Sequence, residues 1–349
     1  MNRATNRVLT TSDWCHAMLR RQRPALCFDG QTQADYRRWR CAFEKRFRDM
    51  LGRFPPQVPL RPRLLERRVF ARYVREHVVF DAEPCMSVPA WVCVPRTRRP
   101  GERLPAVLCA HGHGAGGCSM VGLGPDLKPA YGYVKNIAVR LAEAGFVTIA
   151  PDWRGFGERR EPPETDPAPN DLCNLAHLVA EHFGFNQLAL NIWDGMRALD
   201  YLATRPEVDM RRVGGVGCSF GGTMTTFLAA ADRRIRAACI SGYLSPTGGG
   251  LAALGTCGSQ TLPGLLRWGD RADVAGLICP RPLLIQIGRY DATFPSTGAL
   301  REYARLRRIY TAAGRSDRLE LDLFEGCHEI NVPPLIDWFQ RRLQCGGPA

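Results

Sequence analysis

A serine stands in the middle of the glycine-rich pentapeptide Gly217-Cys218-Ser219-Phe220-Gly221, directly after the apolar run Val213–Gly217. The pattern G-x-S-x-G between a strand and a helix is typical of a nucleophilic serine, because larger residues two positions either side would collide in so sharp a turn. Such a turn presents the hydroxyl above a sheet, beside a helix N-terminus that favours negative charge. We therefore predict that Ser219 is a nucleophile and that Gly217 and Gly221 permit its turn. An inert serine in a glycine-rich turn is the alternative.

A nucleophilic serine needs a base, and the chain offers one histidine in a suitable place. Of the seven histidines, only His328 follows Ser219. It comes after the apolar strand expected at Leu319–Phe324 and before an expected helix, in a loop that can lower it onto the serine. Since the partners in sites of this kind follow the chain order serine, acid, histidine, we predict that His328 is the base.

The base needs an orienting acid, and several aspartates lie between Ser219 and His328. Asp291 directly follows a strand-like apolar run and is our predicted acid. We expect Asp270 and Asp273 to be solvated, because they precede that strand. Asp322 lies within a strand pattern and too close along the chain to His328. Cys218 stands one residue before the serine, so we expect it to point into the core.

The segment Cys109–Gly117, CAHGHGAGG, allows three interpretations. Its two histidines form an H-x-H pair that could bind a metal, and its glycines spell the G-x-G-x-x-G of dinucleotide sites. Its backbone amides, placed after a strand, could instead hold an oxyanion. The dinucleotide interpretation requires a helix at once, whereas Pro125 and Pro129 delay any helix. The metal interpretation lacks further ligands, since His177 and His182 lie at no ligand-like spacing from the pair.

The third interpretation agrees with the predicted nucleophile. The loop after this strand donates one oxyanion amide, and the residue after the serine donates the other. We therefore predict the backbone amides of His113 and Phe220 as oxyanion donors. His111 is then a structural histidine that bonds the loop.

The elements that must position these residues alternate between strand and helix from about residue 104. Short apolar runs predict strands at 106–110, 147–150, 213–217, 237–241, 283–287 and 319–324. Helical patterns follow at 134–144, 187–202, 223–231, 298–313 and 334–343. This order predicts an α/β fold with a mostly parallel sheet and helices on both faces. Two further strands, at 68–80 and 86–95, suit an antiparallel edge because no helix separates them.

We divide the chain into an N-terminal helical extension over residues 1–64 and a catalytic domain over residues 65–349. Apolar residues at helical spacing predict a helix over residues 31–54 of the extension. Two segments interrupt the alternation in the catalytic domain, near residues 155–185 and 244–272. Both follow strands on the side where such sheets bind ligands, so we expect lids or pocket walls there, with plain surface loops as the alternative.

Composition excludes several classes of protein. The net charge of +13 comes mostly from arginines scattered along the chain, and no nucleic-acid module accompanies them. No apolar run is long enough to span a bilayer, and the N-terminus lacks the apolar core of a signal peptide. The fourteen cysteines contain no C-x-x-C pair, which favours free thiols in a reducing compartment. We therefore expect a cytoplasmic protein that binds neither nucleic acid nor membranes.

These motifs together resemble the α/β-hydrolase superfamily over residues 65–343. Within it the chain is similar to the branch with acetyl xylan esterases, cephalosporin deacetylases and dienelactone-hydrolase-like enzymes. The resemblance is carried by AHGHGAGG (110–117), PDWRGFGER (151–159), GCSFGG (217–222), DATFPST (291–297) and GCHE (326–329). It implies a Ser219–His328–Asp291 triad with oxyanion amides from His113 and Phe220.

The expected activity is hydrolysis of a small carboxylic ester, of the acetyl esterase or short-chain carboxylesterase type, through an acyl-enzyme. No cofactor and no metal is expected. A serine peptidase or amidase of the same fold is the nearest alternative, and a non-catalytic binding protein with this fold is another. The arginine-rich extension and the insertion at 155–185 depart from the family pattern. They leave the natural substrate and any homo-oligomer open, since the deacetylases use such elements for both.

Overall fold

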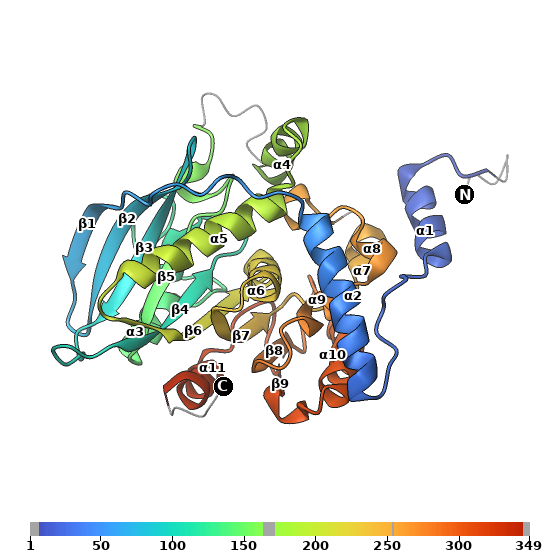
Figure 1. The fold of residues 1–349 in the computed structure, drawn as a ribbon. Coiled ribbons are helices and arrows are strands. Elements are labelled where there is room, and N and C mark those ends of the chain that lie inside the picture. Colours follow the sequence, from blue (N-terminus) through green and yellow to red (C-terminus); the bar gives the residue numbers. More distant parts are fainter. Residues whose placement is uncertain (1–6, 163–171, 253–254, 345–349) are drawn as a thin grey trace.

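A single nine-stranded sheet forms the centre of the protein in a computed structural model, which describes residues 7–162, 172–252 and 255–344. The strand order is β1-β2-β3-β5-β4-β6-β7-β8-β9 (Figure 1). The strands are β1 (Arg63–Val69), β2 (Tyr73–Glu83), β3 (Met86–Pro95), β4 (Leu104–Ala110), β5 (Val147–Pro151), β6 (Val208–Cys218), β7 (Ile235–Ser241), β8 (Leu283–Gly288) and β9 (Leu319–Phe324).

Most of this sheet is parallel, as the alternation of strands and helices predicts. Strand β4 pairs in parallel with both β5 and β6, and β6, β7, β8 and β9 continue the parallel ladder. The antiparallel edge is larger than predicted, because the strand expected at 68–80 is two strands. Strand β1 ends at Val69, and the chain turns so that the Phe70 amide donates to the Tyr73 carbonyl at 2.9 Å. This turn contains neither glycine nor proline, so the strand pattern in the sequence continues across it without a break.

The helices cover both faces of the sheet (Figure 1). They are α1 (Thr11–Arg21), α2 (Gln33–Leu51), α3 (Ile137–Glu143), α4 (Leu172–His182), α5 (Gln187–Thr204), α6 (Phe220–Ala231), α7 (Thr247–Ala252), α8 (Leu265–Trp268), α9 (Arg271–Gly276), α10 (Ser296–Ala312) and α11 (Val332–Phe339). Short 3-10 turns lie at η1 (Gly117–Val121), η2 (Gly157–Arg159), η3 (Gly258–Gln260) and η4 (Ser316–Arg318), and a π-helical turn, η5 (Gln340–Gln344), continues α11. The five helices predicted after residue 104 are α3, α5, α6, α10 and α11.

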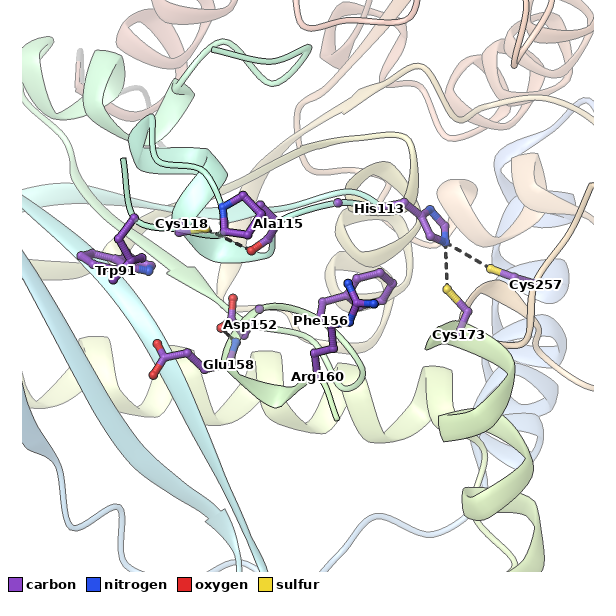
Figure 2. Close-up of a pocket in the computed structure, with 14 residues that line it drawn as sticks. Trp91, His113, Ala115, Cys118, Asp152, Phe156, Glu158, Arg160, Cys173 and Cys257 are labelled. Atoms are coloured by element: carbon purple, nitrogen blue, oxygen red, sulfur yellow. Dashed lines mark hydrogen bonds between the residues drawn. The ribbon is translucent and has the colours of Figure 1, made fainter. Parts of the chain in front are cut away.

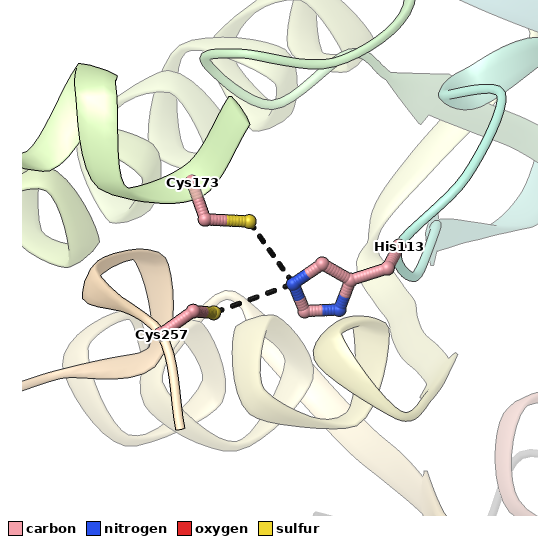
Figure 3. A group of neighbouring side chains, drawn as sticks. All are labelled: His113, Cys173 and Cys257. Carbon is pink, nitrogen blue, oxygen red and sulfur yellow. Dashed lines mark hydrogen bonds between the residues drawn. The ribbon is translucent and has the colours of Figure 1, made fainter. Parts of the chain in front are cut away.

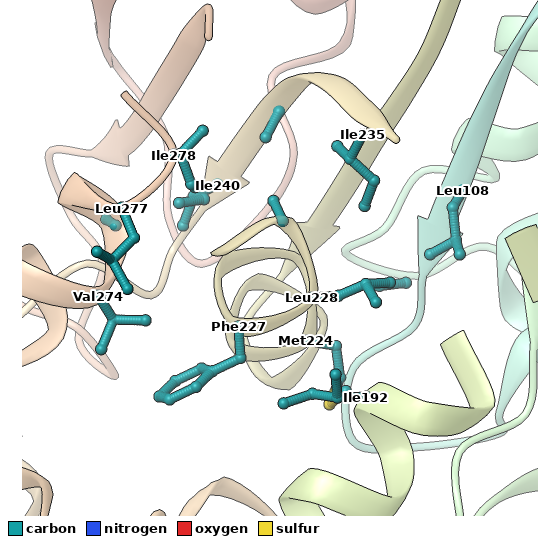
Figure 4. Close-up of a cluster of buried hydrophobic side chains, with 14 of the residues drawn as sticks. Leu108, Ile192, Met224, Phe227, Leu228, Ile235, Ile240, Val274, Leu277 and Ile278 are labelled. Atoms are coloured by element: carbon teal, nitrogen blue, oxygen red, sulfur yellow. The ribbon is translucent and has the colours of Figure 1, made fainter. Parts of the chain in front are cut away.

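The strands at the centre are buried on both faces, which explains their continuous apolar sequences. Alternate residues of β4 enter different cores: Leu108 belongs to the core that includes buried residues of α2, α5, α6 and α9, whereas Val107 and Cys109 belong to the core that includes buried residues of α3 and α11. Helix α6 lies in the middle of the first core, where Phe227 and Leu228 pack among apolar side chains of β4, β7, α5 and α9 (Figure 4). This burial fixes the start of α6 against the sheet.

The N-terminal helix α2 is part of that first core. Its buried residues recur at helical spacing, and Trp39 stacks on Phe43 with ring centroids 5.6 Å apart. Phe47 contacts Phe227 of α6 at 6.1 Å between ring centroids. Helix α1, in contrast, has no buried residue. Helix α2 thus shares one core with the sheet. The division of the chain into two parts at residue 64 stays a prediction.

The two predicted insertions follow β5 and β7. The described part of the first contains η2 and α4, and the described part of the second contains α7, η3 and α8. Residues 163–171 and 253–254 of these insertions lie outside the described residues. Across the described ranges, none of the helices has the length and apolar character that crossing a membrane requires.

We predict that Phe43→Ala destabilises the whole protein by about 3–5 kcal/mol, because Phe43 is fully buried in the core that α2 shares with the sheet. The matched control is Trp14→Ala on α1, where the tryptophan is 57% exposed and the expected loss is below about 1 kcal/mol. Chemical denaturation followed by circular dichroism measures both. Equal, small losses would mean that α2 packs only loosely against the sheet.

Candidate active site

The turn between β6 and α6 holds Ser219 in a strained backbone conformation. Its φ of 62° and ψ of −125° lie outside the regions that residues with a side chain usually adopt. The Ser219 amide donates to the carbonyl of Ser241 at 3.1 Å, which ties the turn to the end of β7. Ser219 is half-buried, between the buried Cys218 and the buried Phe220. This geometry agrees with the sharp turn predicted from the pentapeptide, and with a Cys218 side chain in the core.

Two glycines make this turn possible. A Cβ added to Gly221 would lie 2.0 Å from the carbonyl oxygen of Ala110, and one added to Gly217 would lie 2.3 Å from the carbonyl oxygen of Gly221. Both separations are far below contact distance, and the obstacles are backbone atoms that cannot move aside. The first turn of α6 therefore packs directly against the end of β4, and the predicted need for small residues two positions either side of Ser219 agrees with these contacts.

His328 and Asp291 form a hydrogen-bonded pair at the ends of β9 and β8. The distance from His328 Nδ1 to Asp291 Oδ2 is 2.8 Å. The second carboxylate oxygen, Asp291 Oδ1, accepts the amides of Thr293 and Phe294, each at 2.8 Å. The carboxylate is buried, whereas 22% of the His328 side chain is exposed. An acid fixed in this way can orient the imidazole and stabilise its charged form.

The imidazole of His328 contacts two aromatic rings. Tyr133 stacks on it with ring centroids 5.5 Å apart, and Phe294 stacks on it at 5.7 Å. A Cβ on Gly242 would lie 3.1 Å from His328 Nδ1 and 3.2 Å from Cys218 Sγ. The imidazole therefore lies beside the end of β7, next to the residue that binds the Ser219 amide. Tyr133, which contacts the predicted base, lies 195 residues earlier in the chain and was not among the predicted site residues.

The other aspartates are engaged elsewhere. Asp322 accepts from Gln286 at 2.9 Å and from Asn331 at 3.0 Å. The expectation that Asp273 is solvated is wrong: it is fully buried and pairs with Arg305 at 2.6 Å. Asp270 is partly buried and caps α9. The sequence reasoning missed these roles because α9, a helix of six residues, is too short to show a periodic pattern.

The loop after β4 presents the segment predicted to bind an oxyanion. His111 is buried, with Nδ1 2.7 Å from the Gly112 carbonyl and Nε2 accepting the Trp153 amide at 3.0 Å. Burial lowers the pKa of His111 to about 4, so it stays neutral and structural, as predicted. Phe220 begins α6, where an amide has no acceptor within the helix. The imidazole of His113 packs on the Phe220 ring at 5.1 Å between centroids. The loop after β4 therefore lies beside the turn Gly217–Gly221, which we call the elbow.

A buried ionic network holds the next loop, which follows β5. Arg154 and Arg159 bind the buried carboxylate of Asp194 at 3.0 and 2.8 Å, and Arg154 also binds Glu83. Burial alone would raise the pKa of Asp194, but attraction by the two arginines outweighs it and holds the pKa below its usual value. The PDWRGFGER segment is thereby fixed beside the loop after β4, which carries His111 and His113.

Asp152 links the same two loops. One carboxylate oxygen accepts the Gly117 amide at 2.5 Å, and the other accepts the Glu158 amide at 2.9 Å. Burial nevertheless raises the pKa of Asp152 to about 6. A Cβ on Gly157 would lie 2.2 Å from this carboxylate, so only glycine fits beside it.

A cavity of about 630 Å³ lies beside these loops (Figure 2). Its walls combine the aromatic rings of Trp91 and Phe156 with the charged side chains of Asp152, Glu158 and Arg160. His113, whose imidazole contacts Phe220, forms part of the wall. The side chains of the predicted triad do not line this cavity. It lies next to the elbow, on the side of the loop after β4 that carries His113.

One group of side chains in this wall was not foreseen. The His113 imidazole lies 3.1 Å from Cys173 Sγ and 3.3 Å from Cys257 Sγ, measured from Nε2 (Figure 3). The Cys173 thiol on α4 and the His113 imidazole lower the pKa of the Cys257 thiol. These residues are 60 and 84 positions apart along the chain, so ligand spacing gave no signal. The grouping depends on both predicted insertions folding over the same loop.

The fold and this site define the class of the protein. A mostly parallel sheet, a serine at a strained strand–helix turn, and a histidine–aspartate pair at the ends of the following strands are the features of an α/β-hydrolase. The family model described as "Abhydrolase family" matches residues 1–325. The chain therefore belongs to the Abhydrolase family, and the predicted fold and hydrolase class are confirmed.

Individual relatives agree with this assignment. The chain is 27% identical over 276 residues to the protein named "Putative hydrolase YtaP" of Bacillus subtilis, covering 77% of this chain and 87% of that one. Among solved structures, a crystal structure titled as a putative acetyl xylan esterase from Bacteroides fragilis matches with a TM-score of 0.75 at 18% identity, over 96% of this chain and 86% of that one. A glucuronoyl esterase from Solibacter usitatus matches with a TM-score of 0.62 at 14% identity, over 97% and 98%. The fold is thus shared with the branch that the sequence resembles.

We predict that Asp194→Asn destabilises the protein by about 3–5 kcal/mol, because it leaves the buried Arg154 and Arg159 without their shared carboxylate. The control is Asp49→Asn, which removes an exposed pair with Lys45 and should cost at most about 0.5 kcal/mol. Urea unfolding of each variant gives the two values. A loss for Asp194→Asn as small as that of the control would show that the network does not hold the loop.

Proposed function

We propose that the protein is a serine carboxylic ester hydrolase with Ser219 as nucleophile, His328 as general base and Asp291 as the orienting acid. The observation that carries the proposal is the strained elbow at Ser219 beside an imidazole that is held by a buried carboxylate at 2.8 Å. A structural serine has no need of a φ of 62°, and strain of this kind is retained where it serves a site.

Each residue has a defined task in this reaction. His328 takes the proton of the Ser219 hydroxyl through Nε2 as the oxygen attacks the ester carbonyl, and Asp291 stabilises the imidazolium at Nδ1. The imidazolium then gives the proton to the leaving alcohol, which leaves an acyl-enzyme. Water, activated by the same imidazole, releases the acid and restores the serine.

The tetrahedral intermediate carries a negative oxygen, for which we propose the backbone amides of His113 and Phe220. The first amide belongs to the loop after β4, and the second lies at the N-terminus of α6, whose dipole favours an anion. In the described part of the chain neither amide donates to a protein acceptor. Both are therefore available to an incoming oxyanion.

For the substrate we propose an ester of a small acid, such as acetate, on a polar alcohol. The cavity beside the elbow mixes aromatic rings with charged groups, a combination that suits a hydroxylated alcohol better than a long apolar chain. The similar structures titled acetyl xylan esterase and glucuronoyl esterase are esterases of carbohydrates by their names, which supports the same class here.

We also propose that the enzyme works in a reducing compartment such as the cytoplasm. The thirteen cysteines in the described ranges form no disulfide with one another, and seven of them are buried in the fold. So many cysteines outside disulfides favour a compartment that keeps cysteine reduced.

We predict that a fluorophosphonate probe labels the native protein at Ser219, and that Ser219→Ala abolishes labelling and lowers kcat/KM for p-nitrophenyl acetate at least about 1,000-fold. Ser87→Ala, at a β3 hydroxyl that bonds Asp81, should change neither. Labelling that persists in Ser219→Ala would refute the nucleophile. p-Nitroanilides of the same acids, run in parallel, should be cleaved far more slowly, and preferential cleavage of the anilides would instead indicate an amidase.

A further inference from the structure

We propose that His113, Cys173 and Cys257 form a binding site for a zinc ion, in the wall of the cavity beside the elbow. The site is separate from the proposed triad and rests on the ligand geometry alone. It would bind Zn²⁺ through one imidazole nitrogen and two thiolates, which are ligands that zinc prefers.

The distances between the ligand atoms fit one tetrahedral ion. His113 Nε2 lies 3.1 Å from Cys173 Sγ and 3.3 Å from Cys257 Sγ, and the ligand atoms all lie within 4.8 Å of one another. With Zn–N near 2.0 Å and Zn–S near 2.3 Å, a tetrahedral ion separates nitrogen from sulfur by about 3.5 Å and the two sulfurs by about 3.8 Å. The two nitrogen–sulfur distances therefore need shifts of a few tenths of an ångström, and the sulfur–sulfur distance needs a shift of at most about 1 Å, to admit the ion.

The backbone around the ligands is already held in place. The His113 imidazole packs on the rings of Phe156 and Phe220, with centroids 5.5 and 5.1 Å away. The Gly258 amide, next to Cys257, donates to the side chain of Asn174 at 2.8 Å. Because Asn174 adjoins Cys173, this bond connects the two cysteine-bearing segments independently of their thiols. A preorganised site loses little conformational entropy when it binds an ion.

The fourth coordination position is open toward the cavity. All three ligand residues line the same 630 Å³ cavity, as Figure 2 shows, and the group of ligands within the described residues has no fourth member. A water molecule from the cavity can complete the tetrahedron. Binding releases the two thiol protons, so one Zn²⁺ replaces two H⁺. The net charge of the site therefore does not change when the ion binds.

Such an ion would connect three segments that are distant in the sequence. His113 lies in the loop after β4, Cys173 in the first turn of α4, and Cys257 just before η3 (Figure 3). The ion would therefore fasten both insertions to the loop whose amide we propose as an oxyanion donor. Its expected role is to clamp the cavity wall, so binding should raise the midpoint of thermal unfolding.

The test is a titration of the reduced, metal-free full chain with Co²⁺, which replaces Zn²⁺ in tetrahedral sites and absorbs visible light. We expect saturation at one equivalent, a thiolate-to-cobalt charge-transfer band with intense visible bands, and loss of these bands on addition of Zn²⁺. Cys173→Ser and Cys257→Ser should each weaken Co²⁺ binding at least about 100-fold and lose the charge-transfer band. Cys41→Ser and Cys85→Ser remove exposed thiols on α2 and in the β2–β3 turn, and should bind as the native chain does.

The proposal is overturned if the native chain shows no saturable charge-transfer band, or if the band survives in both Cys173→Ser and Cys257→Ser. Fluorophosphonate labelling of each variant reports whether the elbow still folds. X-ray absorption of the zinc-loaded native chain decides the matter without any variant: two sulfur neighbours near 2.3 Å and one imidazole are expected, and a shell of nitrogen and oxygen alone would contradict the site. A failure here leaves the proposed ester hydrolysis untouched, because labelling of Ser219 tests that separately.

Discussion

The site depends on the close approach of the first turn of α6 to the end of β4. The carbonyl of Ala110 occupies the space where a side chain on Gly221 would lie, and the carbonyl of Gly221 excludes one on Gly217. Only with glycine at both positions can the chain reverse from strand to helix within a few residues. Ser219, midway between these glycines, adopts a positive φ in this turn. Burial of Phe227 and Leu228 in the larger core holds helix α6 in place and offsets this strain.

The parallel sheet then brings the remaining groups to one edge. The carboxyl ends of β4, β6, β8 and β9 lie at the same edge of the sheet, so the loops that follow them meet there although they are far apart in sequence. These loops carry His113, Ser219, Asp291 and His328. Two aromatic rings hold the histidine, and a buried arginine–aspartate network with Asp152 holds the loops beside the cavity. The arrangement of the proposed site is thus a consequence of strand order combined with local packing.

Much of this arrangement was predictable from the sequence, because the signals were local. The G-x-S-x-G turn, the alternation of strands and helices, and the chain order of Ser219, Asp291 and His328 each depend on neighbours along the chain or on a simple topological rule. Residue 273 shows where such reasoning ends: its burial depends on Arg305 from a different helix. Tyr133 and the group formed by His113, Cys173 and Cys257 also depend on contacts between distant loops. The division of one predicted edge strand into β1 and β2 was missed because no glycine or proline marks the turn at Phe70.

In the proposed mechanism the elbow at Ser219, the imidazole of His328 and two backbone amides surround one reacting carbonyl carbon. A crystal structure of the protein after reaction with a small phosphonate ester tests this arrangement most directly, because the tetrahedral phosphorus imitates the intermediate. We predict phosphorus bonded to Ser219 Oγ, one phosphonyl oxygen about 2.7–3.1 Å from the amides of both His113 and Phe220, and His328 Nε2 beside the oxygen of the serine. Phosphorus on another residue, or a phosphonyl oxygen that reaches neither amide, would contradict it.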